Sequence, residues 1–420
     1  MSQSINLYNQ LAKSKLFSKT VNFDLKRIKL ILKKLNNPEK KLKNVVNIIG
    51  SDGKYSLLTS LKYLIEANNQ SAAAYISPSI KDIRERFWMG DKFLNYKEIE
   101  RSIKIIEKQK INLTVFEALT VIFILNASKK RNEYNLIEAG ALFAKDSTNL
   151  FDFPKLQAIV NINKQHLNFL KNKTLNEVIF QKVGFLSNFT NIYIGKQKPK
   201  VLRKIKSILK KNLSKIDYSN SWRLEKSGNN FFYKDDRVSI KLNSKYIHSK
   251  GLLENLCLAI KIALDLKIDK KIIFKTIPKI KFQARLQYIT KGKLVKKISK
   301  NEKLLIDGCH SEVSAKNLAN YLKTLKLPIY GIWGMTKNKD PNLFIKQFKG
   351  IFEKIFTISI ENEKASLSKE LLFKIAKKNK YDVEVSKGFD EALKKISSKE
   401  RKLICIFGSL YLCGNILNKN

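Results

Sequence analysis

The chain has 420 residues, of which 44% are hydrophobic, and it carries a formal charge of +46 at pH 7. This length exceeds what one hydrophobic core usually serves, so we expect a globular protein with two domains. No apolar run is long enough to span a bilayer and nothing near the N-terminus resembles a signal peptide, which predicts a cytoplasmic protein without a membrane partner.

The positive charge belongs mostly to lysines that are scattered through helical patterns such as residues 200–215. A pI near 10 ordinarily suggests a nucleic-acid partner. Here the lysines accompany abundant Ile and Asn, as in proteins encoded by AT-rich codons, and the arginines that would contact phosphate or guanine are few. We therefore expect solvated lysine faces and no specific nucleic-acid partner, with non-specific affinity for polyanions at low salt.

Short β-rich runs alternate with longer amphipathic segments in the first two thirds of the chain. The runs are residues 45–49, 72–76, 136–139, 158–162 and 191–194. Such alternation predicts an α/β fold with a mostly parallel sheet and helices on both faces. Residues 196–247 give the least clear pattern.

A second series of β-rich runs follows the lysine-rich residues 291–300. These runs are residues 304–306, 329–333, 356–360 and 403–407. We place a domain boundary near residue 288, between a larger α/β domain over residues 1–288 and a smaller Rossmann-like α/β domain over residues 289–420. The widely spaced Cys257, Cys309, Cys405 and Cys413 form no CxxC pair, which predicts free buried thiols.

The most informative segment is VVNIIGSDGKYS, where a β-rich run stops at a loop bracketed by Gly50 and Gly53. The glycines allow backbone N–H groups to turn inward around an anion, Lys54 adds a point charge, and Ser56 can reach a phosphate-bound Mg²⁺. Leucines at helical spacing follow, so the loop should lie at a helix N-terminus, where the dipole favours negative charge. Tyr55 interrupts the standard P-loop pattern, and an ordinary strand-turn-helix corner is the alternative.

Further short motifs follow this loop in a fixed order. They are Ser77-Pro78, Glu85-Arg86, Thr114 to Glu117, Glu138-Ala139-Gly140, Asp146 to Asn149, His166, Gln181-Lys182-Val183-Gly184, Asn255, Arg285, Asp307-Gly308-Cys309-His310, Lys339-Asp340 and Gly408-Ser409-Leu410-Tyr411. Each motif alone is weak, but in this order they resemble the folylpolyglutamate synthase and dihydrofolate synthase family, relatives of the Mur ligases. The resemblance covers nearly the whole chain, and it implies a Mur-ligase-like, ATP-binding P-loop domain over residues 1–288 and a glutamate-ligase domain over residues 289–420.

The resemblance implies an ATP-dependent ligase that adds L-glutamate to dihydropteroate, to reduced folates or to both through an acyl phosphate. Such chemistry needs neutralisation of phosphoryl charge and stabilisation of an oxyanion. The implied cofactors are ATP and Mg²⁺, with a carbamylated Lys182 and a monovalent cation as further candidates. The partners would be these small molecules, and we expect a monomer.

The resemblance also implies roles for single residues. The ATP-binding set is Gly50, Ser51, Asp52, Gly53, Lys54, Tyr55, Ser56, Asn255, Arg285 and Asp307. The metal ligands are Ser77, Glu138 and His166, and the catalytic residues are Lys54, Lys182 and His166. The pterin side is Thr114, Val115, Phe116, Glu117, Lys145, Asp146 and Ser147, and the glutamate side is His310 and Ser409.

A structural alternative stands beside each motif. Ser77 is also a typical turn residue before proline, Lys182 is also an ordinary exposed helix residue, and Phe116 also fits a buried helix face. Asp307 and His310 also fit a strand-to-helix turn with an N-cap. His248 matches no motif and is interpreted as structural or exposed.

Several positions depart from the family pattern. Residues 140–146 read GALFAKD where the family has GLGGRLD, so two glycines and an arginine are lost. Ser79, Gln165 and Ser311 stand in place of the family's His, Asp and Asn, and Ser51, Asp52 and Tyr55 stand in place of Thr, Asn and Gly. These changes bear on substrate specificity and rate more than on ATP binding. A Mur-type peptide ligase, a nucleic-acid-binding ATPase and a degenerate non-catalytic relative are the alternative functions.

Overall fold

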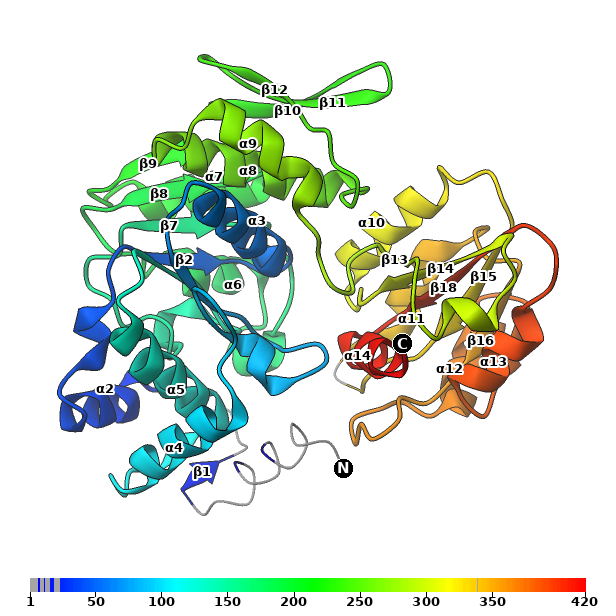
Figure 1. The fold of residues 1–420 in the computed structure, drawn as a ribbon, viewed down its shortest axis with the longest axis horizontal. Helices are drawn as coiled ribbons and strands as arrows, with labels where there is room; N and C mark the ends of the chain where they lie inside the picture. The colour runs from blue at the N-terminus through cyan, green and yellow to red at the C-terminus, as the bar shows by residue number, and fades with distance from the viewer. Residues whose placement is uncertain (1–6, 8–10, 12–15, 19–22, 338) are drawn as a thin grey trace. The chain divides into compact units, whose positions relative to one another are not determined.

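The computed structural model describes residues 7, 11, 16–18, 23–337 and 339–420, which form two compact units (Figure 1). Unit 1 comprises Met1–Asn243 and Leu252–Ile280, and unit 2 comprises Ser244–Gly251 and Lys281–Asn420. The chain therefore passes from unit 1 into unit 2 for the last time at Lys281. The assignment of ATP binding to residues 1–288 and of glutamate ligation to residues 289–420 stays a prediction.

The main sheet of unit 1 has seven strands in the order β4-β3-β6-β2-β7-β8-β9, and only the pair β3 and β4 is antiparallel. The strands are β2 (Val45–Ile49), β3 (Ala72–Tyr75), β4 (Phe87–Met89), β6 (Tyr134–Glu138), β7 (Leu156–Ile159), β8 (Asn191–Ile194) and β9 (Lys215–Tyr218). Each of the five predicted runs overlaps a strand, although those at residues 136–139 and 158–162 begin two residues after the starts of β6 and β7. The run at residues 158–162 extends beyond β7 because Val160 and Ile162 are buried in the loop that follows.

Helices cover both faces of this sheet. They are α2 (Leu25–Lys34), α3 (Lys54–Ala67), α4 (Tyr96–Glu107), α5 (Val115–Lys130), α6 (Leu175–Val183), α7 (Pro199–Leu209), α8 (Lys250–Asp265) and α9 (Lys270–Thr276). Val45 and Ile49 of β2 face the core clusters formed with α2, α4, α5, α6 and α7. Because side chains alternate along a strand, Val46 and Ile48 point to the other face, where α3 packs on β2, β3 and β6.

Residues 222–241 form a separate antiparallel sheet that the sequence does not predict. Its strands are β10 (Trp222–Ser227), β11 (Asn230–Asp235) and β12 (Ser239–Lys241). The predicted helix over residues 200–215 is too long, since α7 ends at Leu209 and β9 begins at Lys215. A short parallel pair, β1 (Phe17–Ser18) and β5 (Leu113–Thr114), completes the described strands of unit 1.

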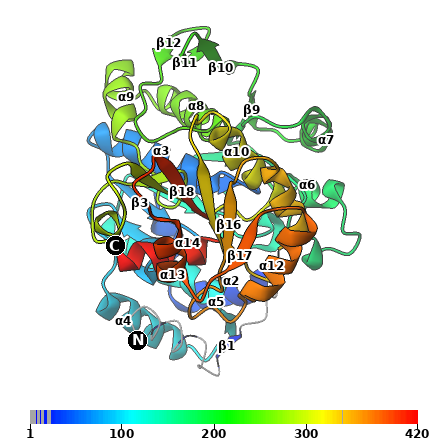
Figure 2. The same cartoon turned by 90° about the vertical axis from the view of Figure 1, so that its right-hand side faces the viewer.

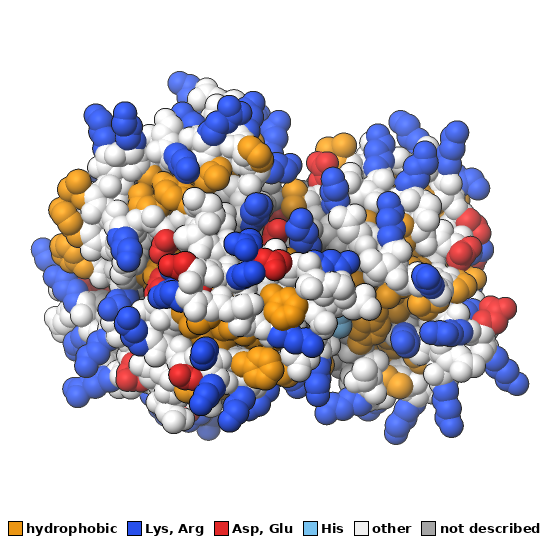
Figure 3. All heavy atoms as spheres, turned by 90° about the horizontal axis from the view of Figure 1, so that it is seen from above, with side chains coloured by type: hydrophobic (Ala, Val, Ile, Leu, Met, Phe, Trp, Pro, Cys, Tyr) orange, Lys and Arg blue, Asp and Glu red, His pale blue; other side chains and the backbone are white. Residues whose placement is uncertain are grey.

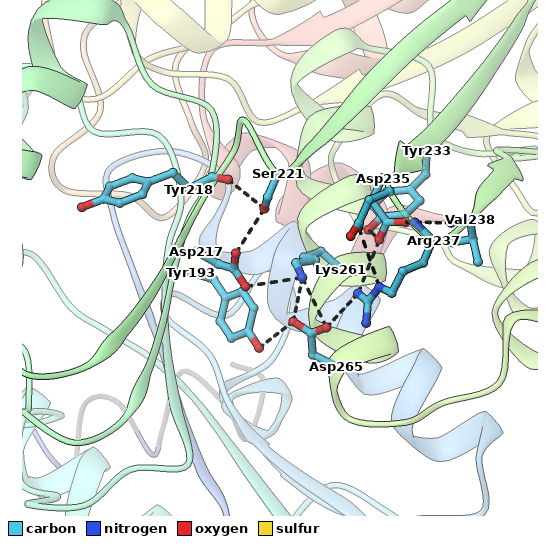
Figure 4. Close-up of polar contacts among 11 residues, drawn as sticks. Tyr193, Asp217, Tyr218, Ser221, Tyr233, Asp235, Arg237, Val238, Lys261 and Asp265 are labelled. Carbon is cyan, nitrogen blue, oxygen red and sulfur yellow. Dashed lines mark hydrogen bonds and ion pairs between the residues drawn. The ribbon is translucent and has the colours of Figure 1, made fainter.

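A charged network attaches this antiparallel sheet to α8 and to the main sheet (Figure 4). Asp265 of α8 accepts hydrogen bonds from Arg237, which follows β11, at 2.9 Å and from the hydroxyl of Tyr193 on β8 at 3.0 Å. Lys261 forms ion pairs with Asp265 at 2.9 Å and with Asp217 of β9 at 3.4 Å. One carboxylate thus contacts side chains from three different elements.

Unit 2 contains a six-stranded sheet in the order β13-β14-β18-β15-β16-β17, in which only β13 is antiparallel. Its strands β16, β17 and β18 are labelled in Figure 2. The strands are β13 (Gln287–Ile289), β14 (Glu302–Asp307), β15 (Ile329–Trp333), β16 (Lys354–Thr357), β17 (Val383–Val385) and β18 (Lys402–Phe407). The helices are α10 (Glu312–Leu322), α11 (Pro341–Ile345), α12 (Lys369–Lys378), α13 (Phe389–Ile396) and α14 (Leu410–Lys419). The predicted α/β architecture is confirmed in this unit too.

Two further expectations concern the whole chain. Cys257, Cys309, Cys405 and Cys413 are buried free thiols, as predicted. Within the described residues, no helix combines the length and the apolar character that crossing a membrane requires.

Candidate active site

The loop between β2 and α3 depends on two glycines. Gly50 and Gly53 have φ values of 145° and 101°, a region that favours glycine. A Cβ atom at Gly50 would lie 2.4 Å from Val160 Cγ2, and one at Gly53 would lie 2.3 Å from Asn255 Nδ2. Gly53 is the N-cap of α3 and provides no side-chain cap, so the loop leads into a helix N-terminus suited to an anion.

Hydrogen bonds from neighbouring segments hold the two ends of this loop. The N–H of Ser51 donates to the carbonyl of Asn161 at 2.8 Å. The hydroxyl of Ser56 donates to the carbonyl of Gly53 at 2.9 Å and accepts from Asn255 Nδ2 on α8, also at 2.9 Å. Asn255, assigned to ATP by resemblance, therefore lies directly against the loop.

Lys54 lies beside a pair of oxygen-bearing side chains at the carboxyl ends of β3 and β6. Its Nζ is 3.3 and 3.4 Å from two carbonyl oxygens of its own loop and 3.9 Å from Glu138 Oε1. Glu138 Oε2 accepts a hydrogen bond from the N–H of Ser77 at 3.1 Å. The loop lysine and two of the three predicted metal ligands thus lie at one edge of the sheet. This is the expected place, because ligands of open parallel sheets bind outside the carboxyl ends of the strands.

Arg86 joins this group, although no role was predicted for it. Its Nη1 donates to Ser77 Oγ at 3.1 Å, and only 7% of the residue is exposed. Arginine is uncommon in this lysine-rich chain, so the Glu85-Arg86 motif was the feature of the sequence that could have identified Arg86 as a site residue.

Lys182 is buried next to the same loop, so the alternative of an exposed helix residue is wrong. Its Nζ donates to the carbonyl of Gly50 at 2.8 Å and to that of Ala141 at 2.7 Å. Burial, together with the nearby charge of Lys54, lowers the pKa of Lys182 to about 7, and Asp146 and Asp52 oppose the shift only in part. A buried lysine of this kind is partly neutral near pH 7.

His166 has a left-handed backbone with φ of 60°, and its ring stacks on Phe169 with centroids 6.2 Å apart. In the part of the chain that the structure describes, no three His, Cys, Asp or Glu side chains form a group suited to a metal ion. Ser77 and Glu138 are adjacent and offer oxygen ligands of the kind that Mg²⁺ prefers. The assignment of His166 as the third ligand stays a prediction.

In unit 2, Asp307 ends β14 and is deeply buried. It accepts hydrogen bonds from the N–H groups of Leu286 and Cys309, both at 2.8 Å. Burial raises the pKa of Asp307, and the neighbouring Arg285 opposes that shift. A Cβ atom at Gly308 would lie 3.2 Å from Arg285 Nη1, so the predicted ATP-binding pair Arg285 and Asp307 lies side by side.

The two predicted glutamate-side residues lie at helix starts of unit 2. His310 Nδ1 is 2.9 Å from the carbonyl oxygen of Gly308, and the next residue, Ser311, caps α10. Ser409 caps α14 by accepting a hydrogen bond from the N–H of Tyr411 at 3.1 Å. The N-cap that the alternative interpretation placed at Asp307 or His310 is therefore supplied by Ser311.

Comparisons with known proteins agree with this geometry. The family model described as dihydrofolate synthetase, C-terminal domain, matches residues 290–419. The dihydrofolate synthetase of Saccharomyces cerevisiae is 22% identical over 94% of this chain and 97% of its own length. The dihydrofolate synthase/folylpolyglutamate synthase of Buchnera aphidicola is also 22% identical, over 96% of this chain and 94% of its own. The family model and these relatives both point to the folylpolyglutamate synthase and dihydrofolate synthase family.

Solved structures show the same fold. Escherichia coli FolC in complex with DHPP and ADP aligns with a TM-score of 0.86 and 18% identity over 99% of this chain and 97% of its own. The folylpolyglutamate synthase of Thermotoga maritima aligns with a TM-score of 0.80 and 21% identity over 99% of this chain and 96% of its own. The chain therefore shares the fold of these two structures along nearly its whole length.

The family's pterin segment, Thr114 to Glu117, begins α5 with a capping box. The N–H of Thr114 donates to Glu117 Oε2 at 2.6 Å, and the N–H of Glu117 donates to Thr114 Oγ1 at 3.2 Å. Arg27 also donates to Glu117 Oε1 at 3.0 Å. A pterin amino group would have to compete with these donors for the Glu117 carboxylate, whereas Val115 and Phe116 remain half-buried.

Gly140 marks the point where the two pterin-side segments meet. A Cβ atom there would lie 2.2 Å from Asp146 Oδ2 and 2.9 Å from Phe116 Cε1. Burial raises the pKa of Asp146, and the hydroxyl and N–H of Thr148 oppose this by donating at 2.6 and 3.0 Å. Ser147 is hydrogen-bonded to Thr120 at 2.8 Å, while Lys145 is exposed.

The residues that replace the family's glycines at positions 141–145 fill the core. Leu142 and Phe143 are buried within the cluster that packs α6 and α7 on the sheet. The side chains at these two positions therefore contribute to packing, and a change in how the segment receives substrate stays a prediction.

Proposed function

We propose that this protein is an ATP-dependent ligase that joins L-glutamate to dihydropteroate, to reduced folates or to both. The observation that supports the proposal most strongly is the similarity to this family along nearly the full chain, including 94% of it against a dihydrofolate synthetase. The local geometry agrees, since an anion-binding loop, a lysine and a buried carboxylate meet at one edge of a parallel sheet.

The proposed reaction has two steps. The acceptor's carboxylate oxygen attacks the γ-phosphorus of ATP, the bond to ADP breaks, and an acyl phosphate forms. The amino nitrogen of glutamate then attacks the acyl carbon, phosphate leaves with the former carboxylate oxygen, and the nitrogen loses a proton to give the amide. Both steps need negative charge on oxygen to be stabilised by fixed donors.

In this proposal the loop from Gly50 to Ser56 holds the ATP phosphates. Lys54 Nζ, which lies 3.9 Å from Glu138 Oε1, exchanges its contacts with the two loop carbonyls for charge-assisted hydrogen bonds to phosphate oxygens. Ser77, Glu138 and His166 would hold Mg²⁺, which neutralises phosphate charge when bound. Asn255, Arg285 and Asp307 would bind the rest of ATP.

The acceptor would lie against the pterin-side residues named above, and His310 and Ser409 would contact glutamate. Of the two acceptors, we propose dihydropteroate as the primary one. The support is that both the matching family model and the yeast relative are described as dihydrofolate synthetases. Comparison of the two acceptors in one assay tests this choice.

Carbamylation of Lys182 is part of the proposal. A pKa of about 7 leaves much of the amine neutral, and the neutral amine is the form that attacks CO₂. The carbamate keeps one N–H, so it can retain only one of the contacts with the carbonyls of Gly50 and Ala141. Peptide mass spectrometry after bicarbonate treatment should show the added CO₂, and an unmodified amine beside an occupied metal site would exclude it.

The decisive experiment incubates the purified protein with Mg-ATP, radiolabelled glutamate and either dihydropteroate or tetrahydrofolate. We expect an amide product that depends on ATP and on the acceptor. If neither acceptor yields a product although ADP binds, the ligase proposal fails and the degenerate relative is correct. The expected monovalent-cation requirement, monomeric state and cytoplasmic location remain predictions, and light scattering tests the second of these.

A further inference from the structure

Asp52 places a carboxylate inside the loop that should receive phosphate, two residues before Lys54. Like charges repel, so a carboxylate that faced the nucleotide would weaken its binding. The structure instead places two side-chain amides on this carboxylate. Asn163 Nδ2 donates to Oδ2 at 2.5 Å, and Gln165 Nε2 donates to Oδ1 at 3.1 Å and to Oδ2 at 3.0 Å.

The two amides belong to the segment between β7 and His166, and backbone contacts bind that segment to the same loop. Ser51 Oγ donates to the carbonyl of Asn163 at 3.2 Å and accepts from its N–H at 3.1 Å. Ser51 N–H donates to the carbonyl of Asn161. The position of the loop is thus linked to the segment that ends at His166.

We propose that Asp52 is a positioning residue, and that Asp52, Asn163 and Gln165 form an amide clamp. The clamp fixes the phosphate loop against the segment bearing His166 and directs the Asp52 charge away from the bound phosphates. The inference rests on the proposed function only in taking a nucleotide as the ligand. It also explains two departures from the family pattern. The family has Asn at position 52 and Asp at position 165, and this chain has Asp52 and Gln165, so the amide and the carboxylate have exchanged places.

The clamp requires a carboxylate on one side and an amide on the other. Either position 52 or position 165 can carry the carboxylate, provided that the other position carries the amide. Gln165→Glu would bring two carboxylates together, which removes two hydrogen bonds and adds repulsion. We expect the Kd for ADP and the KM for ATP to rise about tenfold or more, with a smaller change in kcat. Asp52→Asn removes the acidic partner without adding repulsion, so we expect its Kd for ADP to rise as well, but less than that of Gln165→Glu.

The double variant Asp52→Asn/Gln165→Glu tests the clamp directly. It restores a carboxylate facing an amide with the direction reversed, and we expect the Kd for ADP to return to within about threefold of wild type. Gln347→Glu is the matched control, because its amide donates to the carbonyl of Leu343 at an exposed site in unit 2. That change should leave nucleotide binding unaltered.

The measurements are ADP calorimetry, steady-state kinetics and thermal unfolding, with circular dichroism to check the fold of each variant. If the double variant binds ADP no better than Gln165→Glu, or if Gln165→Glu alone changes neither ADP affinity nor melting temperature, the clamp is overturned. ADP binding and unfolding are read without any folate acceptor. A wild-type protein that shows the coupling but forms no amide would therefore contradict the ligase proposal and leave the clamp supported.

Discussion

Lys54 is the residue in which sequence pattern and geometry agree most closely. The sequence places it in a glycine-bracketed loop, and its Nζ lies near Glu138 and two loop carbonyls at the edge of the sheet. A cation held there can neutralise phosphate charge that develops during phosphoryl transfer. Its side chain contributes few core contacts, because it is only partly buried.

We therefore expect Lys54→Ala to lower kcat/KM for ATP by about a hundredfold or more while leaving the fold intact. Lys97→Ala, which removes an exposed lysine of α4, is the matched control and should leave kcat/KM unchanged. Glutamate-dependent ADP release and circular dichroism measure the two quantities. Normal turnover by Lys54→Ala would contradict the assigned role.

Lys182 gives a prediction about stability and pH. Its pKa is about 7 in the folded protein and near 10.5 in a model compound, so the unfolded chain binds the additional proton between these values. Stability contributed by this residue therefore rises with pH across that window, by at most about 1.4 kcal/mol per unit. Below pH 7 Lys182 is also charged in the folded protein, so its contribution to stability no longer depends on pH.

The test compares wild type with Lys182→Met by denaturant unfolding in CO₂-free buffer from pH 7.5 to 9. We expect the difference in unfolding free energy, wild type minus variant, to increase with pH. Lys97→Met, at an exposed site, should show no such trend. A pH-independent difference for Lys182→Met would mean that the buried amine titrates near its ordinary pKa.

At the scale of elements, several helix ends use lysine or asparagine where glycine is common. Lys380 follows α12 with φ of 63°, and Tyr381 N–H closes the turn on the carbonyl of Ala376 at 3.2 Å. A non-glycine residue in the left-handed region is strained by about 1 kcal/mol. The turn forms because its hydrogen bonds and the burial of Tyr381, whose hydroxyl donates to the carbonyl of Ile345 at 2.7 Å, outweigh that strain.

Lys380→Gly should therefore raise the unfolding free energy of unit 2 by about 0.5–1 kcal/mol. Lys378→Gly, two residues earlier and inside α12, should lower it by a similar amount, since glycine is unfavourable within a helix. Paired thermal unfolding curves measure both changes. A loss of stability in Lys380→Gly would show that the lysine side chain matters more than the backbone strain.

The network around Asp265 explains how a small antiparallel sheet is held on unit 1. Burial alone would raise the pKa of Asp265, but hydrogen bonds from Lys261 and Arg237 bring it below its ordinary value. A carboxylate whose pKa is lower in the folded than in the unfolded protein stabilises the fold at pH values above its unfolded pKa, which is near 3.9. This stabilisation is lost as the pH falls through the pKa of the folded protein.

We expect Asp265→Asn to lower the unfolding free energy by roughly 1–3 kcal/mol at pH 7 and by less at pH 3, where the wild-type carboxylate is itself being protonated. Asp236→Asn is the control, because that carboxylate is largely exposed. Denaturant unfolding at the two pH values provides the comparison. An equal loss at both pH values would contradict the charge argument.

At the scale of the whole molecule, lysine side chains are spread over the visible face of both units with few acidic groups among them (Figure 3). Such a surface attracts any polyanion at low ionic strength. We expect affinity for a generic single-stranded polyanion such as poly(U) to fall steeply between 50 and 200 mM salt, by about 300-fold for six phosphate contacts.

Filter binding of labelled poly(U) over a salt series measures this affinity, and glutamate ligation is followed without nucleic acid as the control. Ligation should proceed in the absence of the polymer. Salt-resistant binding, or ATP hydrolysis that needs the polymer, would favour the nucleic-acid-binding ATPase.

Local patterns predicted the elements that are buried on both faces. The runs that became β2, β3, β6, β8, β14, β15 and β18 are dense in apolar residues, and such density marks a central parallel strand. Edge strands were missed. β4, β13 and β17 have three residues each, and β10 to β12 alternate exposed polar residues with a few apolar ones, so their pairing partners rather than their composition define them.

The sequence by itself determined the α/β class, the phosphate loop and the ordered motifs, because glycine positions and apolar periodicity are local properties of the chain. Only the tertiary structure placed Asn255 on the loop, Arg86 on Ser77, Lys182 between two carbonyls and the two amides on Asp52. Each of these contacts joins residues from different segments. Its strength depends on burial and distance in three dimensions, and neither is encoded in the spacing of one segment.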